Sequence, residues 1–414
     1  MQHQELNTYR LTNGMTLVVE TMRNVQSAAF TLLLPAGSVF DPPGQNGVAS
    51  ILATWLMKGA GARGSQELTT DLDNLGVQRS ETVGVSHLML NGATLSHILR
   101  PTLEIYADVV RAPHLAEEQF ESSMAYVEQM LGSIEDEPRQ KVMQELRRRT
   151  FKRPWGLPPE GSLDDLPRIE PLDVQQNWGN CFRPQETILG IAGNVEFEDV
   201  KSWVEELFGD WDNPRSGEFE ELDGGPPFDH LMQESTQTQI GIAYPSVPYR
   251  HPDYYAAWAA VGVLSGGMSS RLFTEVREKR GLCYSVYASL NSLPHDGRVV
   301  CYAGTTNERA QETLDVTLQV IRDLENGIAD DELDRCKARA KSSLIMQQES
   351  SMARSSSVAR DWFYLGEVQT LDEIHRKIDA LTPQTVLDHV HQFPAREFTI
   401  LTIGPEMLEI PNDL

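Results

Sequence analysis

Residues 47–59 of the chain are Gly47-Val-Ala-Ser50-Ile-Leu-Ala53-Thr54-Trp-Leu-Met-Lys58-Gly59. This pattern predicts a helix from about Gly47 to Lys58. Ser50 and Thr54 are four residues apart, so both side chains lie on one face of that helix, close to Ala53. Two histidines at this spacing could hold a zinc ion, but serine and threonine hydroxyls are poor zinc ligands. Because alanine can neither accept nor donate a proton, this face offers neither a metal site nor a general base.

A second informative stretch covers residues 266–287, Gly266-Gly-Met-Ser-Ser270-Arg-Leu-Phe-Thr-Glu-Val-Arg277-Glu-Lys-Arg-Gly281-Leu-Cys-Tyr284-Ser-Val-Tyr287. It predicts a Gly-Gly turn, a helix over 270–279, a glycine C-cap and a strand over 282–290. Arg277 and Tyr284 then lie at the end of the helix and the start of the strand. From spacing alone, such an arginine is most often a solvated surface residue, and such a tyrosine is most often half-buried packing.

Both stretches resemble the M16 peptidases, the family of insulinase, pitrilysin and the mitochondrial processing peptidase. In that family the first stretch typically has the pattern G-x-A-H-x-x-E-H-x-x-x-K-G. Ser50 and Thr54 occupy the positions of the two histidines, and Ala53 occupies that of the catalytic glutamate. A catalytic zinc site needs three protein ligands, an open position for water and a general base. The resemblance therefore implies a chain that binds no zinc and hydrolyses no peptide by itself.

The third zinc ligand of the family is a glutamate on a later helix. The matching stretch here is Tyr126-Val-Glu128-Gln129-Met130-Leu131, and the best register puts Gln129 or Met130 at the ligand position. A shift of one or two residues would place Glu128 there instead. A single carboxylate would not hold zinc in either register.

The second stretch retains what the first has lost, since family members carry an arginine and a tyrosine at the positions of Arg277 and Tyr284. The resemblance implies that they act on a substrate bound at a facing zinc site. The arginine would hold a peptide carbonyl oxygen, and the tyrosine hydroxyl would stabilise the tetrahedral intermediate. Fixed donors of this kind stabilise the charge that develops in the transition state.

The glycine and serine residues that precede this helix are weaker candidates. We expect Gly266, Gly267, Ser269 and Ser270 to contribute to substrate binding. A phosphate-binding loop is set aside, because no Lys-Ser/Thr pair follows the glycines and no strand pattern precedes them.

Composition and charge limit the classes of partner. The chain has 414 residues, 35 Lys and Arg against 60 Asp and Glu, and a formal charge of −25. The negative potential makes nucleic acid an unexpected partner and favours basic peptides. No apolar run reaches the ~18 residues of a membrane-spanning helix, and no signal peptide precedes the first strand, so we expect a cytoplasmic protein without a membrane span.

Neither the cysteines nor a histidine pair near the C-terminus is expected to form a disulfide or metal site. Without a C-x-x-C pair, the four cysteines are expected to be reduced thiols that are buried or half-buried: Cys181, Cys283, Cys301 and Cys336. His389 and His391 could chelate a metal only from a strand. They fall at the expected end of a helix and lack further ligands, so we do not assign them a metal.

An internal repeat indicates a duplicated domain. At a constant offset of 212 residues, five positions match: Val174, Thr187, Ile188, Leu189 and Ile191 correspond to Val386, Thr399, Ile400, Leu401 and Ile403. Residues 213–229 are rich in Pro, Gly and acidic residues and predict a linker. We expect a first M16-like domain over 1–212, with the degenerate zinc motif, and a second over 230–414, with the Arg/Tyr pair.

The expected fold class is α+β, with an antiparallel-rich sheet covered by helices in each domain, as in the M16/LuxS-like metallohydrolase type. In the first half, strands over 15–20 and 28–34 are expected to form an antiparallel pair. Further strands lie near 77–92 and 186–193. Helices are expected near 65–74, 97–111, 116–133, 137–150 and 196–208. We expect the helices to cover one face of the sheet.

Two functional hypotheses remain open. In the first, the chain is the zinc-free subunit of a heterodimeric M16B peptidase that encloses unfolded or short peptides. Arg277 and Tyr284 act in trans on a partner with an intact H-x-x-E-H motif, which carries the zinc. In the second, the chain is a core or scaffold protein, or a peptide-binding protein, of the M16 fold, like the core subunits of respiratory complexes. The retained Arg277 and Tyr284 favour the first hypothesis.

Overall fold

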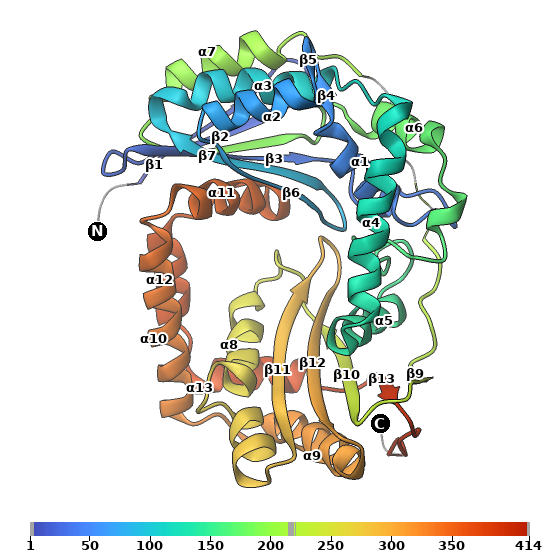
Figure 1. The fold of residues 1–414 in the computed structure, drawn as a ribbon. Helices are drawn as coiled ribbons and strands as arrows, with labels where there is room; N and C mark the ends of the chain where they lie inside the picture. The colour runs from blue at the N-terminus through green and yellow to red at the C-terminus, as the bar shows by residue number, and fades with distance from the viewer. Residues whose placement is uncertain (1–3, 214–218, 220, 412–414) are drawn as a thin grey trace. The chain divides into compact units, whose positions relative to one another are not determined.

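The computed structural model describes residues 4–213, 219 and 221–411 (Figure 1). The chain forms two compact units, neither of which is a continuous stretch of sequence. Unit 1 comprises Met1–Ser133, Arg153–Leu222 and Ile345–Gln369; unit 2 comprises Ile134–Lys152, Asp223–Leu344 and Thr370–Leu414.

Unit 1 is built on a six-stranded mixed sheet in the order β1-β2-β8-β3-β7-β6. Its strands are β1 (Glu5–Arg10), β2 (Thr16–Thr21), β3 (Ser27–Leu34), β6 (Gln78–Val83), β7 (Leu88–Leu95) and β8 (Ile188–Gly193). The expected direct pairing of the strands over 15–20 and 28–34 is wrong. β8 lies between β2 and β3, parallel to the first and antiparallel to the second. Its six residues are all buried, as a central strand requires.

Helices cover both faces of the sheet of unit 1. On one face lie α2, α3 and α7, and on the other lies α11, which packs against β8, β3 and β2 (Figure 1). The helices of this unit are α1 (Val48–Leu56), α2 (Ser65–Asn74), α3 (Leu99–Arg111), α4 (Phe120–Glu135), α6 (Pro171–Cys181), α7 (Phe197–Phe208) and α11 (Ser351–Leu365). The expectation of one covered face missed α11, because its sequence lies in the second half of the chain.

Unit 2 repeats this plan around a five-stranded sheet in the order β11-β12-β10-β13-β9. Its strands are β9 (Phe228–Met232), β10 (Gln237–Ser246), β11 (Cys283–Ser292), β12 (Gly297–Thr306) and β13 (Thr399–Gly404). Its helices are α5 (Pro138–Thr150), α8 (Tyr254–Ser265), η5 (Phe273–Lys279), α9 (Ala310–Arg322), α10 (Asp330–Gln347), α12 (Leu371–Asp379) and α13 (Pro383–Gln392). Helix α5 packs on one face, against β10 and β13.

The two sheets show that the chain contains two copies of one α+β domain. The order β2-β8-β3-β7-β6 in unit 1 corresponds to β9-β13-β10-β12-β11 in unit 2. In both of these five-strand series the first pair of strands, β2-β8 or β9-β13, is parallel and the other pairs are antiparallel. The internal duplication inferred from the sequence is therefore confirmed.

Two helices at corresponding positions are exchanged between the units. Helix α5 follows the first repeat in sequence, yet its Val142 and Leu146 are buried in unit 2 beside Leu401 of β13. Helix α11 follows the second repeat, yet its Val358 is buried in unit 1 beside Val18 of β2. A cut at the linker alone therefore does not reproduce the compact units.

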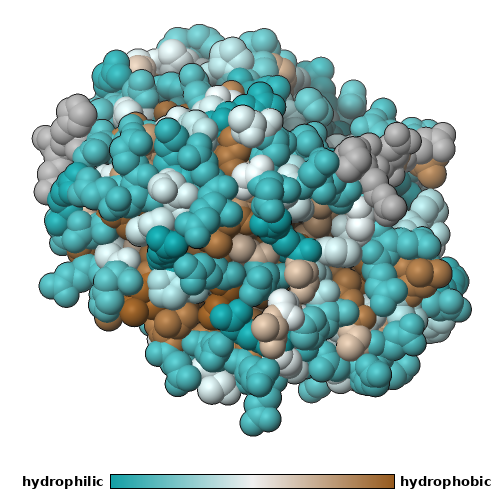
Figure 2. Space-filling model, turned by 90° about the horizontal axis from the view of Figure 1, so that it is seen from above, coloured by the Kyte–Doolittle hydropathy of each residue, from teal (hydrophilic) through white to brown (hydrophobic). Residues whose placement is uncertain are grey.

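The expected linker over 213–229 is described only in part, since 214–218 and 220 lie outside the described residues. Its last two residues belong to strand β9. In the described part of the chain, no helix has the length and apolar character needed to cross a membrane. The face shown in Figure 2 is mostly hydrophilic with smaller hydrophobic areas.

Candidate functional site

The candidate site is built on the connection between the helical segment η5 and strand β11 in unit 2. Its sequence predicts an α-helix, but residues 273–279 form a π-helix, with one residue more per hydrogen-bonded turn. The segment is anchored by Val276, which is buried in the core of unit 2. It ends at Lys279, and the N–H of Gly281, two residues later, donates to the carbonyl oxygen of Arg277 at 3.0 Å. Gly281 has φ +62°, the left-handed conformation that the expected glycine C-cap requires.

Tyr284 follows this turn as the second residue of β11. The pairing of β11 with β12 is irregular between Cys283 and Ser285, so a bulge lies at Tyr284. The next residue that faces the core is Val286, which packs against the apolar cluster of unit 2. The Tyr284 side chain is directed away from that cluster, and the residue is 83% exposed. Half-buried packing, the ordinary role of a strand tyrosine, is therefore not its role here.

The structure brings Arg277 and Tyr284 together. The guanidinium carbon of Arg277 lies 4.8 Å from the centre of the Tyr284 ring. It also lies 4.8 Å from the centre of the Phe273 ring, one turn earlier on η5. Both distances fall within the range of cation–π attraction. Phe273 was not among the residues expected at the site, although its spacing from Arg277 places it on the same side of the helix.

Every other basic residue of this segment has an acidic partner. Arg271 contacts Glu332 at 2.7 Å, and Lys279 and Arg280 contact Glu275 at 2.6 and 2.8 Å. These two cations lower the pKa of the Glu275 carboxyl group. The side chain of Arg277 forms no hydrogen bond or ion pair with any described residue. Its N–H groups are therefore held by stacking but remain available to a ligand.

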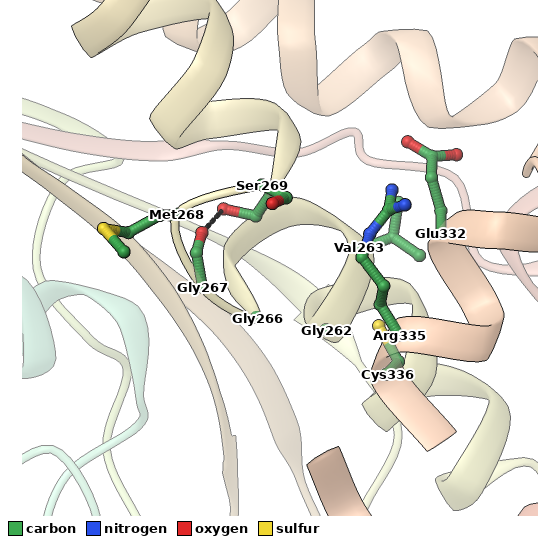
Figure 3. A pocket seen from close by; sticks show the side chains of 10 residues that line it. Gly262, Val263, Gly266, Gly267, Met268, Ser269, Glu332, Arg335 and Cys336 are labelled. Carbon is green, nitrogen blue, oxygen red and sulfur yellow. Dashed lines mark hydrogen bonds between the residues drawn. The ribbon is translucent and has the colours of Figure 1, made fainter. Parts of the chain in front are cut away.

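The glycine and serine residues before η5 line a separate small pocket of about 120 Å³ (Figure 3). Glu332, Arg335 and Cys336 of α10 line its opposite side. Neither Arg277 nor Tyr284 is among the lining residues.

The side chains of this loop are largely occupied with the loop itself. The Ser270 hydroxyl donates to the carbonyl oxygen of Gly267 at 2.6 Å, the bond drawn in Figure 3. Gly267 has φ +150°, and a Cβ atom on Gly266 would lie 2.3 Å from the carbonyl oxygen of Gly262. Both glycines are thus explained by the backbone path. A role of Gly266, Gly267, Ser269 and Ser270 in substrate binding stays a prediction.

Ser50, Ala53 and Thr54, the positions of the expected degenerate zinc motif, lie on α1 in unit 1. The Ser50 hydroxyl donates to the carbonyl oxygen of Pro159 at 2.8 Å, and the Thr54 hydroxyl donates to the carbonyl oxygen of Ser50 at 3.3 Å. Ala53 is buried. Both hydroxyl groups are therefore engaged in local packing, and the three side chains do not fit a zinc ion.

In the part of the chain that the structure describes, none of the candidate positions for a third zinc ligand belongs to a group of side chains that could hold a metal ion. Glu128 and Gln129 are exposed on α4, and Met130 is half-buried. Within residues 4–213, 219 and 221–411, no three His, Cys, Asp or Glu side chains are grouped so as to hold a metal ion. His389 is buried near the end of α13, and His391 contacts the carbonyl oxygen of Glu325.

The start of α1 is fixed by Asp41, a residue not expected from the sequence to have a role. Asp41 is buried, and its carboxylate accepts the N–H groups of Gly47 and Ala49 at 2.9 and 2.8 Å. Burial raises the pKa of Asp41 to about 7, although these hydrogen bonds oppose the shift. The available signal in the sequence was the acidic residue Asp41 shortly before a helix with glycine at its start, because an acidic group is favourable at a helix N-terminus.

The four cysteines are free thiols, as predicted. Cys181, Cys301 and Cys336 are buried, and Cys283 is half-buried. Burial raises the pKa of Cys283, next to Tyr284, to about 11, so this thiol is not activated as a nucleophile.

Comparisons with known proteins agree with this architecture. Two solved structures have closely similar folds: a peptidase M16 inactive domain from Pseudomonas fluorescens, with a TM-score of 0.87, and a protease from Helicobacter pylori, with a TM-score of 0.89. They are 21% and 18% identical, and the alignments cover 98% and 97% of this chain and 99% and 100% of theirs. At this identity the likeness concerns the fold.

The sequence relatives extend over the whole chain. An uncharacterized zinc protease of Rickettsia bellii is 26% identical over 98% of this chain and 99% of its own length. The uncharacterized zinc protease YmxG of Bacillus subtilis is 26% identical over 97% and 98%. Residues 16–159 match the family Insulinase (Peptidase family M16), and residues 168–340 match the Peptidase M16 inactive domain. The chain is therefore a member of the M16 peptidase family.

Proposed function

We propose that this chain is the zinc-free subunit of a two-chain M16 peptidase. In this proposal unit 2 supplies Arg277 and Tyr284 to a peptide bound at the active site of a partner chain. The partner is an M16 chain with an intact H-x-x-E-H motif, which supplies the zinc and the general base. The present chain would also help to enclose the peptide.

One observation carries this proposal: Arg277 is free of acidic partners while the basic residues around it are paired. A solvated surface arginine in so acidic a chain would be expected to find a carboxylate, as Lys279 and Arg280 do with Glu275. Instead, Arg277 lies against Tyr284, which is 83% exposed. Keeping two aligned donors unpaired has no structural benefit, so it supports a role in ligand binding.

The chemistry of the two side chains suits a peptide undergoing hydrolysis. The Arg277 guanidinium can donate two hydrogen bonds in one plane to carbonyl oxygen atoms of the peptide backbone. The Tyr284 hydroxyl can donate one hydrogen bond to the oxygen that becomes negative when the carbonyl carbon turns tetrahedral. Donors that are already in place need no reorganisation at that moment, and each contributes a large part of the rate acceleration.

The first unit supports the division of labour, because its α1 cannot replace the missing ligands. Ser50 and Thr54 donate their hydroxyl protons to backbone carbonyl oxygens, and Ala53 has no proton to exchange. A homodimer would therefore contain the donors of unit 2 twice and the metal ligands not at all. The formal charge of −25 favours peptides with Lys and Arg as substrates.

The test is peptide hydrolysis by this chain, by an H-x-x-E-H homologue from the same organism, and by their mixture, with zinc present. The probe is a quenched fluorescent peptide rich in Lys and Arg. We expect activity of the mixture to exceed the sum of the separate chains and to fall about 10²- to 10³-fold with Tyr284→Phe. Tyr126→Phe, at another exposed tyrosine, is the matched control and should leave the activity unchanged.

Complex formation is measured in parallel by analytical ultracentrifugation. If the two chains associate and Tyr284→Phe has no effect on hydrolysis, the catalytic role of unit 2 is wrong. If they associate without any gain in activity, the chain is a scaffold or peptide-binding protein of the M16 fold.

A further inference from the structure

We propose that Phe273 is a positioning residue, which holds the Arg277 guanidinium in place above Tyr284. This inference rests on the proposed function, because it concerns how the donor pair is kept ready for a peptide. It assigns a task to a side chain that would not touch the substrate itself.

The geometry of the three side chains carries the inference. The Cζ atom of Arg277 is 4.8 Å from the ring centres of both Phe273 and Tyr284. Phe273 precedes Arg277 by four residues on the π-helical segment, and Tyr284 follows it on β11. The guanidinium is therefore flanked by two aromatic rings that come from two different elements. No carboxylate or carbonyl group among the described residues competes for it.

Phe273 is less buried than its neighbours Leu272 and Val276. Leu272 and Val276 are buried in the core of unit 2, whereas Phe273 is half-buried and does not belong to that core. A leucine at position 273 would still cover the same surface of the helix. Outside that core, the Phe273 ring lies against the Arg277 guanidinium.

The expected effect follows from the freedom of an arginine side chain. An unrestrained arginine samples many rotamers, and ordering it on binding opposes the hydrogen bonds that it forms. A flanking ring removes part of this freedom before the peptide arrives. Cation–π contacts of partly exposed groups have strengths that correspond to a loss of roughly 3- to 30-fold in kcat/KM when the ring is removed.

The experiment compares Phe273→Leu, Phe273→Tyr, Arg277→Ala and the double variant Phe273→Leu/Arg277→Ala in the complex with the H-x-x-E-H homologue. The probe is the same quenched peptide rich in Lys and Arg. We expect Phe273→Leu to lower kcat/KM about 3- to 30-fold and Phe273→Tyr, which keeps a ring, to preserve it. In the Arg277→Ala background, Phe273→Leu should have no further effect, because its action passes through Arg277. An unchanged kcat/KM for Phe273→Leu, or an equal loss in both backgrounds, would overturn the inference.

A second readout does not depend on catalysis and uses the chain alone. Arginine residues are labelled with ¹⁵N, and the Arg277 side-chain signal is identified by its loss in Arg277→Lys. Ring currents of the flanking rings should shift the Arg277 Nε–H proton, and Phe273→Leu should move it toward the position of a free arginine. Phe273→Tyr should retain the shift. If the complex is inactive but these shifts behave as expected, the peptidase proposal fails while the positioning role stands; an unchanged shift in Phe273→Leu refutes that role.

Discussion

The guanidinium carbon of Arg277 lies 4.8 Å from the centre of the Tyr284 ring, although a helix end and a turn separate the two residues along the chain. Gly281 makes this possible, because its left-handed backbone turns the chain from η5 into β11. The bulge at Tyr284 then directs the side chain out of the sheet core. The pair is thus created by the backbone path from η5 into β11, within unit 2.

Replacing Arg277 by lysine tests whether the shape of the cation matters as well as its charge. Lysine keeps the positive charge but loses the planar group that stacks on the rings and donates two parallel hydrogen bonds. Charge-assisted hydrogen bonds contribute about 1.5–3 kcal/mol each, so we expect kcat/KM of the two-chain complex to fall roughly 10- to 100-fold. The measurement is steady-state hydrolysis of the quenched peptide.

Arg280→Lys provides the matched control, three residues further on. Arg280 is paired with Glu275 on the surface and does not contact Tyr284, so the expected change is less than about twofold. Equal losses for Arg277→Lys and Arg280→Lys would mean that general positive charge, and not the Arg277–Tyr284 pair, acts on the peptide.

The local structure of the site could be predicted from the sequence to a large extent. The glycine turn, the helix end, the C-cap at Gly281 and the following strand are encoded by neighbouring residues, and all occur in the structure. The π-helical pitch of η5 could not be predicted. Each backbone hydrogen bond of a π-helix spans one residue more than in an α-helix, but Leu272 and Val276 are the buried positions in either case, so the hydrophobic pattern does not distinguish the two.

Longer-range features were harder to predict for a physical reason. The sequence around β2 and β3 is that of two buried strands separated by a short loop, which also describes a hairpin. They are separated in the sheet because the fully apolar β8, more than a hundred residues later in the chain, pairs with both of them. The exchange of α5 and α11 likewise depends on tertiary packing, since each helix would have an apolar face in either unit.

The zinc motif cannot be regained by restoring its three residues alone. The triple variant Ser50→His/Ala53→Glu/Thr54→His would place larger side chains at two buried positions, and Ser50 is already hydrogen-bonded to Pro159. We expect a loss of about 1–3 kcal/mol in the free energy of unfolding from overpacking. Without a third ligand, zinc should not be retained after dialysis.

The measurements for this prediction are urea unfolding and metal analysis of the dialysed protein. Adding Met130→Glu to the triple variant tests the register of the third ligand, and Gln129→Glu tests the alternative. Stoichiometric zinc in the triple variant would show that the position can still bind the metal with two histidines and a glutamate.

A buried ion pair anchors the exchanged helix α11 in unit 1. Arg354 of α11 is 1% exposed and Glu20 of β2 is 5% exposed. The Nε and Nη2 atoms of Arg354 lie 2.8 and 2.7 Å from the Glu20 Oε2 atom. Glu20→Gln would leave the guanidinium buried without its counter-charge, and we expect a loss of about 3–5 kcal/mol in the free energy of unfolding. Urea unfolding of the chain checks this.

The double variant Glu20→Leu/Arg354→Leu separates the charge from the packing. It removes both buried charges, so its loss should be smaller than that of Glu20→Gln. Glu196→Gln is the control at an exposed ion pair with Arg23, where we expect a much smaller loss than for Glu20→Gln. Similar losses for all three variants would show that burial of the Glu20–Arg354 pair has no special effect.

His87 should oppose the folding of unit 1 in mild acid. This residue is buried, its ring lies 4.3 Å from that of Phe363, and Arg183 is nearby. Burial first, and the positive charge of Arg183 second, lower the pKa of His87 to about 3. Between pH 6.5 and 3 the unfolded chain therefore binds a proton that the folded chain does not. The contribution of His87 to the free energy of unfolding should therefore fall as the pH decreases, by about 2 kcal/mol at pH 5.

The His87→Leu variant isolates this contribution, because leucine fills a similar volume and cannot be protonated. In urea unfolding, the free energy of unfolding of His87→Leu relative to that of the natural chain should rise by about 2 kcal/mol from pH 7.5 to pH 5. His97→Gln is the control at an exposed histidine and should keep the natural pH dependence. If His87→Leu loses as much stability between these two pH values as the natural chain does, other groups cause the acid sensitivity.

The buried carboxyl group of Asp41 cannot mimic the effect. Its pKa is raised to about 7, so its protonation at lower pH favours the folded state.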